Sequence, residues 1–340
     1  MAGFPRSYAR RTMPQYVNSS RVPIALGVFL ANDKYDHNPD PFTISATTLM
    51  KPLRQIILSR RVPHEDYALE LADQMKSRLG TAIHDAIENA WVTNKDAALT
   101  ALGYPKHVID RIKVNPTEEE LQANPSIIPV YMEQRMSKQV GRWTVSGKFD
   151  FIGDGMVQDF KTTGTYTYTN QTNAIKYSQQ GSIYRWLDPK KITEDRMEIH
   201  YIFTDWKANL AKSDPSYPKQ SFHTQSYDLM SYEETDRYIR NKLALIDKYM
   251  DSPEEEIPEC APDDLWQSEP TWKYYKDPNK RTRSTKNFDN AADAYMRQAQ
   301  DGYVGVVVET PGQVKACQYC SAFPVCSQKD RLVQAGLLVL

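Results

Sequence analysis

The chain has 340 residues, of which 40% are hydrophobic and 25% are charged, and its formal net charge is −1. This length is enough for one large domain or two smaller ones. The sequence has no run of about 18 apolar residues that could span a membrane, and its first residues lack the apolar core of a signal peptide. We therefore expect a cytoplasmic protein whose contacts with any nucleic acid depend on local basic patches.

The N-terminal third is predicted to be irregular at first and then helical. Residues 1–45 contain five prolines and are expected to form an irregular arm. Helices are predicted over 43–61 and 65–93, where apolar residues recur at helical spacing. Gly80 within the second helix suggests the close approach of a neighbouring element. A short helical segment and a loop are expected over 94–125.

Strands and helices alternate in the rest of the chain, which is typical of an α/β fold. We expect a core domain over 46–250 and a C-terminal lobe over 251–340, where prolines become frequent. The predicted elements are strands over 127–136, 142–152 and 155–162, a helix over 174–187, strands over 196–204 and 221–229, a helix over 231–250 and a strand over 303–309.

A hairpin is predicted where Gly147–Phe151 and Val157–Thr163 flank an Asp-Gly turn. Side chains at i and i+2 of a strand share a face, so Asp159 and Lys161 should point the same way. Asp150 on the neighbouring strand can face them. Two carboxylates and one ammonium at a sheet edge suit a divalent cation that activates water against a phosphodiester. The alternative is a solvated ion pair on a hairpin.

Two predicted helices carry polar pairs one turn apart. His84 precedes Glu88 by four residues, and its imidazole could be a third ligand that suits Mn²⁺ better than Mg²⁺. Gln180 and Tyr184 lie on the helix after the hairpin, where both can hydrogen-bond a phosphate or hold Lys161 in place. Taken alone, each pair also fits an ordinary structural or surface role.

Four segments together carry a family resemblance. The chain contains, in this order, GTAIHDAIE, GKFDFI, VQDFKTT and QGSIY. They resemble the four motifs of the RecB-like branch of the PD-(D/E)XK nucleases, which includes recombination nucleases, the CRISPR adaptation nuclease and many phage exonucleases. The resemblance runs from Ile44 to Leu187. It implies a restriction-endonuclease-like α/β core, with a central mixed sheet flanked by helices and closed by a cysteine-rich C-terminal lobe.

The resemblance also implies roles for individual positions. It implies that Mg²⁺ or Mn²⁺ is bound by His84, Asp150, Asp159 and the backbone carbonyl of Phe160. Lys161 matches the lysine that orients the attacking water or neutralises developing negative charge. Such a preorganised charge is commonly worth roughly 10²–10³-fold in rate.

Further residues would support this site. Gln180 and Tyr184 match the motif that supports the catalytic residues and the DNA strand. Glu88 is expected to contact the metal ligands without binding the ion itself. Glu133 is expected either to do the same or to bind the ion as an extra carboxylate.

The four cysteines lie within the C-terminal quarter of the chain. They are Cys260, Cys317, Cys320 and Cys326, and the last three form C-x2-C-x5-C. A reducing cytoplasm disfavours disulfides, and four thiolates close a zinc or an iron–sulfur site. Some RecB-like nucleases carry a [4Fe-4S] cluster with one cysteine near the N-terminus, where this chain has Lys51. We expect a [4Fe-4S] cluster completed by Cys260, with Zn²⁺ as the alternative.

Three basic segments are candidates for DNA contact. They lie at 6–11, at 51–61 and at 276–286. The last is preceded by Trp272, Tyr274 and Tyr275, which could stack on single-stranded bases; a solvated loop is the alternative.

The expected function is metal-dependent cleavage of DNA with free ends by an exonuclease, in recombination, replication or DNA processing and alongside the proteins of those pathways. The resemblance and the compact length suggest a phage-encoded protein acting in the host cytoplasm. One alternative is a structure-specific endonuclease or end trimmer. Another is a non-catalytic DNA-binding or assembly module, against which the complete set His84, Asp150, Asp159 and Lys161 argues. The sequence predicts no oligomeric state.

Overall fold

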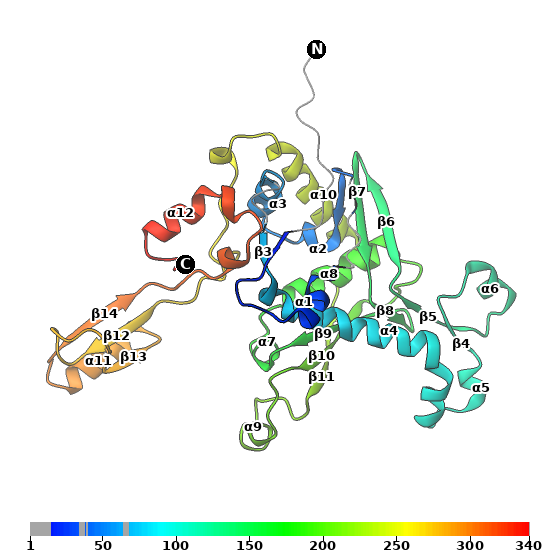
Figure 1. Cartoon of the computed structure of the whole chain (residues 1–340), viewed down its shortest axis with the longest axis horizontal. Coiled ribbons are helices and arrows are strands. Elements are labelled where there is room, and N and C mark those ends of the chain that lie inside the picture. The colour runs from blue at the N-terminus through cyan, green and yellow to red at the C-terminus, as the bar shows by residue number, and fades with distance from the viewer. Residues whose placement is uncertain (1–14, 34–37, 39, 64–67, 340) are drawn as a thin grey trace, which may run out of the picture. The chain divides into compact units, whose positions relative to one another are not determined.

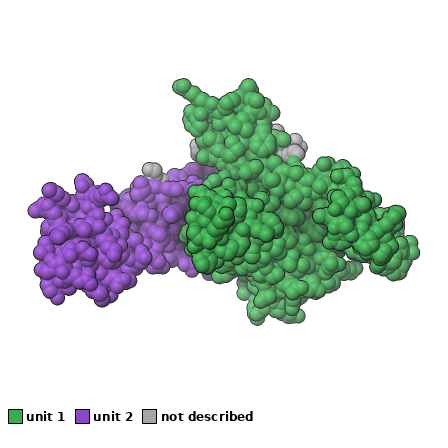
Figure 2. Space-filling model, turned by 90° about the horizontal axis from the view of Figure 1, so that it is seen from below, with its two compact units in different colours: residues 1–50, 67–243 green, residues 51–66, 244–340 purple. Residues whose placement is uncertain are grey.

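The computed structural model describes residues 15–33, 38, 40–63 and 68–339 (Figure 1). The chain forms two compact units, coloured separately in Figure 2. Unit 1 comprises residues 1–50 and 67–243, and unit 2 comprises 51–66 and 244–340. The segment 51–66 thus belongs with the C-terminal residues rather than with the rest of the predicted core. Among the described residues, no helix is both long and apolar enough to cross a membrane.

Unit 1 is built on a six-stranded mixed sheet in the order β11-β10-β9-β8-β5-β4. The pairs β9/β10 and β4/β5 are parallel, and the other neighbours are antiparallel. Helices flank this sheet, so the predicted α/β class with a central mixed sheet is confirmed at that level. The strands are β4 (Ile112–Val114), β5 (Ile128–Met132), β8 (Phe151–Gly153), β9 (Met156–Thr163), β10 (Arg196–Phe203) and β11 (Phe222–Asp228).

Strands β8 and β9 form the predicted hairpin. Its two turn residues, Asp154 and Gly155, have φ values of 49° and 72°, as a type I′ turn requires. Pairing runs only from Gly153↔Met156 to Phe151↔Gln158. Asp150 therefore lies just before β8 rather than within the predicted strand, and β9 continues past the end of its partner.

Two smaller sheets complete unit 1. The predicted irregular arm over 1–45 includes regular structure, namely β1, β2 and the helix α1 (Ile24–Ala31). The first sheet has the order β2-β7-β6, and β1 pairs with β3 in parallel. The strands are β1 (Gln15–Val17), β2 (Thr43–Ser45), β3 (Ala68–Glu70), β6 (Arg135–Val140) and β7 (Trp143–Lys148).

Helices α4 (Met75–Ala101) and α8 (Ala174–Leu187) cover opposite faces of β9. Alternate side chains of a strand point to opposite faces. Phe160 accordingly packs with residues of α4, including Trp91, in an apolar cluster. On the other face, Asp159 accepts a hydrogen bond from Gln180 of α8. The helix of His84 and the helix of Gln180 thus approach the same strand from two sides.

The first two predicted helices differ from the observed ones. The helix predicted over 43–61 is interrupted, because Pro52 ends the preceding turn and opens a new helix. The helix predicted over 65–93 begins later and runs further. Residues 94–125 hold more regular structure than predicted. The helices not yet named in unit 1 or at its border are α2 (Ala46–Leu49), α5 (Lys106–Ile109), α6 (Glu118–Ala123), α7 (Thr165–Thr169), α9 (Ala208–Ser213) and α10 (Tyr232–Tyr249).

Unit 2 contains an antiparallel sheet in the order β13-β12-β14 and a cysteine-rich region. Strand β14 lies close to its predicted position, whereas β12, β13 and α11 were not predicted. Around the cysteines, Leu265, Val314 and Leu338 form a buried cluster. The elements are α3 (Leu53–Ser59), β12 (Thr271–Tyr275), β13 (Lys286–Phe288), α11 (Ala291–Gln300), β14 (Val306–Thr310) and α12 (Ser327–Gln334).

Two helical glycines should respond oppositely to alanine. A Cβ at Gly80 would meet no described atom within 4 Å, which contradicts the predicted close approach. Gly80→Ala should therefore raise the free energy of unfolding by about 0.5–1 kcal/mol through helix propensity. A Cβ at Gly181 would lie 2.6 Å from Met197 Sδ and 2.7 Å from Leu229 Cδ2, so Gly181→Ala should lower it by about 1–3 kcal/mol. Chemical denaturation of both variants tests this, and shifts of the same sign would contradict it.

Candidate functional site

Three groups converge where β9 extends beyond β8. The Phe160 N–H donates to Asp150 Oδ2 over 3.3 Å, and the Phe160 carbonyl oxygen lies 2.8 Å from His84 Nε2. His84 Nδ1 lies 3.3 Å from Asp150 Oδ2. The Phe160 backbone bonds to these side chains instead of to β8, because β8 ends opposite Gln158. An imidazole, a carboxylate and a carbonyl oxygen are thereby brought within reach of one small cation.

A second carboxylate joins this group. Ligand atoms of His84, Glu133 and Asp150 all lie within 4.8 Å of one another, so these residues could hold a metal ion. Glu133 lies between β5 and β6 with a φ of 53°, and its N–H donates to the Asp150 carbonyl oxygen over 3.2 Å. A non-glycine residue in this left-handed region carries strain, and such residues cluster at functional sites. Glu133 also pairs with Lys148.

Asp159 and Lys161 lie on the α8 face of β9, as their spacing predicts. Asp159 is 2% exposed, and its Oδ1 lies 2.5 Å from Lys161 Nζ. Gln180 Nε2 donates to Asp159 Oδ2 and to Tyr184 Oη, each over 3.0 Å. Two hydrogen bonds and one ion pair thus join four of the predicted site residues, from buried residues of α8 to the partly exposed ammonium of Lys161.

Burial and neighbouring charges shift the pKa values of the groups in this site. Burial opposes protonation of His84, but its hydrogen bond to Asp150 and the charge of Asp150 outweigh burial and raise its pKa to about 9. Burial raises the pKa of Asp159 to about 6, although Lys161 acts in the opposite direction. Burial likewise raises the pKa of Glu133 against the effect of Lys148. The negative charge of the carboxylates is therefore balanced by the protonated imidazole of His84 and by the ammonium groups of Lys148 and Lys161. A bound metal ion could replace part of this positive charge.

Glu88 plays a smaller part than its neighbour His84. It lies one turn further along α4 and raises the pKa of Glu133 through its charge. Within the described part of the chain, the group of residues that could hold a metal ion does not include it.

Gln180 should contribute measurably to stability. Replacing it with leucine removes the amide that donates to the buried Asp159 carboxylate. A buried acceptor left without its donor costs about 1–3 kcal/mol. We expect Gln180→Leu to lower the free energy of unfolding by that amount in urea denaturation. Gln179→Leu, at the preceding position, is the matched control and should change it little; equal losses in both variants would contradict this role.

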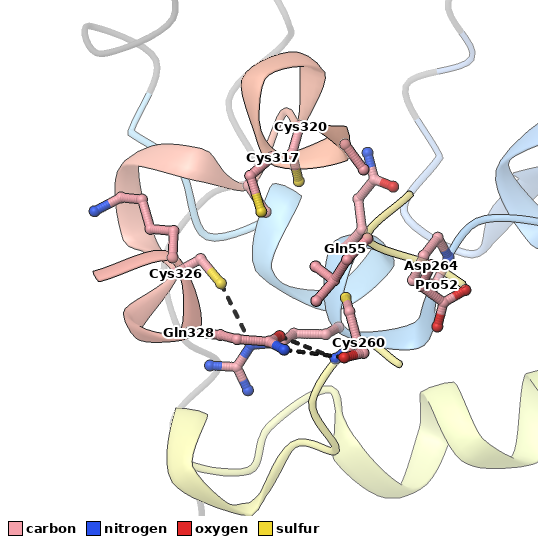
Figure 3. Close-up of a pocket in the computed structure, with 13 residues that line it drawn as sticks. Pro52, Gln55, Cys260, Asp264, Cys317, Cys320, Cys326 and Gln328 are labelled. Atoms are coloured by element: carbon pink, nitrogen blue, oxygen red, sulfur yellow. Dashed lines mark hydrogen bonds between the residues drawn. The ribbon is translucent and has the colours of Figure 1, made fainter. Parts of the chain in front are cut away.

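The four cysteines of unit 2 line a single cavity of about 40 Å³ (Figure 3). Figure 3 shows their sulfur atoms directed toward a common space. Cys317 lies within a 3₁₀ turn (Ala316–Tyr319), Cys320 follows that turn, Cys326 precedes α12, and Cys260 comes from a distant loop. All four are free thiols, and no three of these sulfurs lie within 4.8 Å of one another.

Two polar side chains fix the walls of this cavity. Arg54 is 3% exposed, and its Nε donates to Cys326 Sγ over 3.4 Å. It also forms an ion pair with Glu254. Gln328 forms two 2.9 Å hydrogen bonds with the backbone of Cys260, one in each direction. Burial raises the pKa of Cys260 to about 12.

The predicted basic segments have different outcomes. The segment 6–11 lies outside the described residues. In the segment 51–61, the prediction of a surface patch is wrong for the buried Arg54, and Arg61 is bonded to the carbonyl oxygens of Tyr249, Met250 and Ser252. The cations of 276–286 are exposed.

Two solved structures resemble the chain at low sequence identity. No family model and no curated protein matches the chain. The crystal structure of SSO0001 resembles it with 14% identity and a TM-score of 0.38, over 64% of this chain and 81% of that one. A phage-related exonuclease from Haemophilus somnus 129PT shows 13% identity and a TM-score of 0.28, over 64% of this chain and 96% of that one. Both TM-scores are too low to establish a shared fold, so a functional conclusion depends on the geometry of the site.

Proposed function

We propose that the chain is a divalent-metal-dependent deoxyribonuclease that degrades DNA from free ends. The observation that carries the proposal is the convergence of His84, Asp150 and the Phe160 carbonyl at the end of β8, with Asp159 and Lys161 on the same strand as Phe160. The ordered motifs that resemble PD-(D/E)XK nucleases support the same chemistry.

The donor atoms fit a hard divalent cation. Carboxylate and carbonyl oxygens suit Mg²⁺ and Mn²⁺, and an imidazole nitrogen favours Mn²⁺ of the two. His84, Glu133 and Asp150 have ligand atoms close enough together to hold the ion, and the Phe160 carbonyl lies beside His84 and would add a further oxygen. The motif resemblance alone adds Asp159 as a ligand, because in the structure its two oxygens contact Lys161 and Gln180. When bound, such an ion lowers the pKa of a water ligand and stabilises the charge that develops on the phosphate.

The remaining residues orient the reacting groups. Lys161 supplies a fixed positive charge, and its half-exposed side chain can reach a phosphate oxygen or the attacking water. Asp159 keeps this ammonium in place, and Gln180 and Tyr184 keep Asp159 in place. Because the chain of contacts ends at buried residues of α8, the charge is positioned before substrate binds, which is what electrostatic stabilisation of a transition state requires.

The test compares the wild-type protein with Asp150→Asn on linear and closed circular DNA, single- and double-stranded, with Mn²⁺ or with EDTA. We expect degradation of linear DNA only, lost in EDTA and in the variant. Calorimetry should show that the variant binds Mn²⁺ weakly. Cutting of circles would replace the exonuclease with an endonuclease. DNA binding without cleavage under any metal would leave a non-catalytic binding module.

We also infer that the four cysteines hold a [4Fe-4S] cluster rather than zinc. A tetrahedral zinc site with Zn–S bonds of about 2.3 Å places its sulfurs about 3.8 Å apart. These thiols surround one cavity, yet no three of their sulfurs lie within 4.8 Å of one another. A cluster takes one thiolate on each of four separate irons, which keeps the sulfurs further apart. Iron, sulfide and zinc analysis of anaerobically purified protein decides between them, with Cys320→Ser as the control that should lose the bound group.

A further inference from the structure

The tip of the β12–β13 hairpin in unit 2 carries a dense positive charge. Between residues 276 and 286 there are five basic residues and one acidic residue, in a chain whose net charge is −1. All five cations are exposed. The acidic residue, Asp277, accepts a hydrogen bond from the Asn279 N–H and lies 3.9 Å from Lys280. We call the following residues the basic tip: Lys276, Lys280, Arg281, Arg283 and Lys286.

The basic tip stands on an ordered base. Tyr274 is fully buried, and its hydroxyl oxygen lies 3.1 Å from Asp301 Oδ2 and 2.9 Å from the Val304 carbonyl oxygen, so that it can donate to either. Inside the loop, the Thr285 N–H donates to the Tyr274 carbonyl over 2.8 Å, and Arg281 Nε donates to the Pro278 carbonyl over 2.8 Å. These bonds hold the cations together on one projection, so that less conformational entropy is lost when an anion binds.

The composition of the tip indicates which partner it fits. Residues 276–287 contain no apolar side chain except Pro278, whereas the centre of a protein interface is apolar and depleted of charge. Tyr274 and Tyr275 are buried, so the predicted stacking of these two rings on bases is wrong. Trp272, the third predicted ring, is partly exposed and lies in β12 rather than in the loop. Clustered cations in a loop that carries no aromatic side chain are suited to phosphates, which determine affinity without reading sequence.

We propose that the basic tip binds the phosphodiester backbone of DNA, without stacking on or reading its bases. This inference rests on the proposed function, because it identifies the substrate of the same enzyme. It assigns to unit 2 a contact that holds DNA by charge, separate from the residues of the candidate metal site in unit 1.

The test measures DNA binding in EDTA, where cleavage does not interfere. The triple variant Lys280→Gln, Arg281→Gln and Arg283→Gln should bind both single- and double-stranded DNA about 10–100-fold more weakly at low salt. The slope of log K against log salt should be less negative by about 2–3 in this variant, because each lost phosphate contact changes the slope by roughly 0.9. The loss should be equal for oligo-dT and for mixed sequence, because no base is read.

Matched controls separate this contact from net charge. Lys76→Gln, Lys190→Gln and Lys212→Gln remove the same charge from exposed positions elsewhere and should leave affinity nearly unchanged. Equal weakening in both triple variants would overturn the proposal, as would a tip variant that binds DNA normally but loses binding to polyglutamate, a model of an acidic protein. A purified protein that binds DNA through the tip but never cleaves it would sink the nuclease proposal and leave this one standing.

Discussion

Lys161→Ala should lower the rate of DNA cleavage by about 10²–10³-fold while leaving Mn²⁺ binding intact. The ammonium lies 2.5 Å from Asp159 Oδ1 on the same face of β9. It is therefore a positive charge that is positioned before DNA binds, and it is not a ligand of the metal ion. Removing it withdraws stabilisation from the transition state alone. Single-turnover cleavage of linear DNA at saturating Mn²⁺, together with calorimetric Mn²⁺ binding, measures the two properties separately.

The matched control for this variant is Lys190→Ala, which removes an equally charged but exposed side chain and should cleave like the wild type. A Lys161→Ala protein that retained the wild-type single-turnover rate would show that the lysine only forms an ion pair with Asp159. Loss of Mn²⁺ binding along with activity would show instead that the charge maintains the metal site, which contradicts the separation of roles.

Local periodicity explains why much of this site could be predicted. Asp159 and Lys161 share a face because strand side chains alternate, and Gln180 lies beside Tyr184 because four residues make about one helical turn. The Asp-Gly turn predicted the hairpin because only a few residue types adopt positive φ at both turn positions. Each of these relations spans only a few residues, so the sequence displays it directly.

Other parts of the site depend on long-range geometry that no local pattern displays. Glu133 lies close to His84 and Asp150, and its own backbone has a positive φ between β5 and β6, which belong to two different sheets. Tertiary packing stabilises such a strained backbone conformation, so no local sequence pattern predicts it. The availability of the Phe160 carbonyl follows from the shortness of β8, which depends on where the chain turns toward β7. The sequence does not predict strand β12, because its two buried tyrosines stand beside a run of cations that is typical of a surface loop.

Arg54 is the clearest case, because sequence placed it among surface cations and the structure buries it beside the cysteines. It connects Cys326, Glu254 and the Ile257 carbonyl, the last over 2.9 Å. We expect Arg54→Leu to lower the free energy of unfolding by about 2–3 kcal/mol. That is less than the roughly 3–5 kcal/mol typical of breaking a fully buried pair, because the Glu254 side chain is 22% exposed and stays partly solvated.

Arg54→Lys should recover little of this loss, since one ammonium cannot reproduce the planar donors that reach three separate acceptors. Arg283→Leu, which replaces an exposed arginine of the same unit, is the control and should leave the unfolding midpoint in urea nearly unchanged. Iron and zinc content of the same preparations provides a second readout, because Arg54 is bonded to a cysteine sulfur and a misplaced Cys326 would release whatever the four thiols bind. A lysine variant with wild-type stability and full metal content would mean that the site needs only a positive charge at this position, and not the guanidinium geometry.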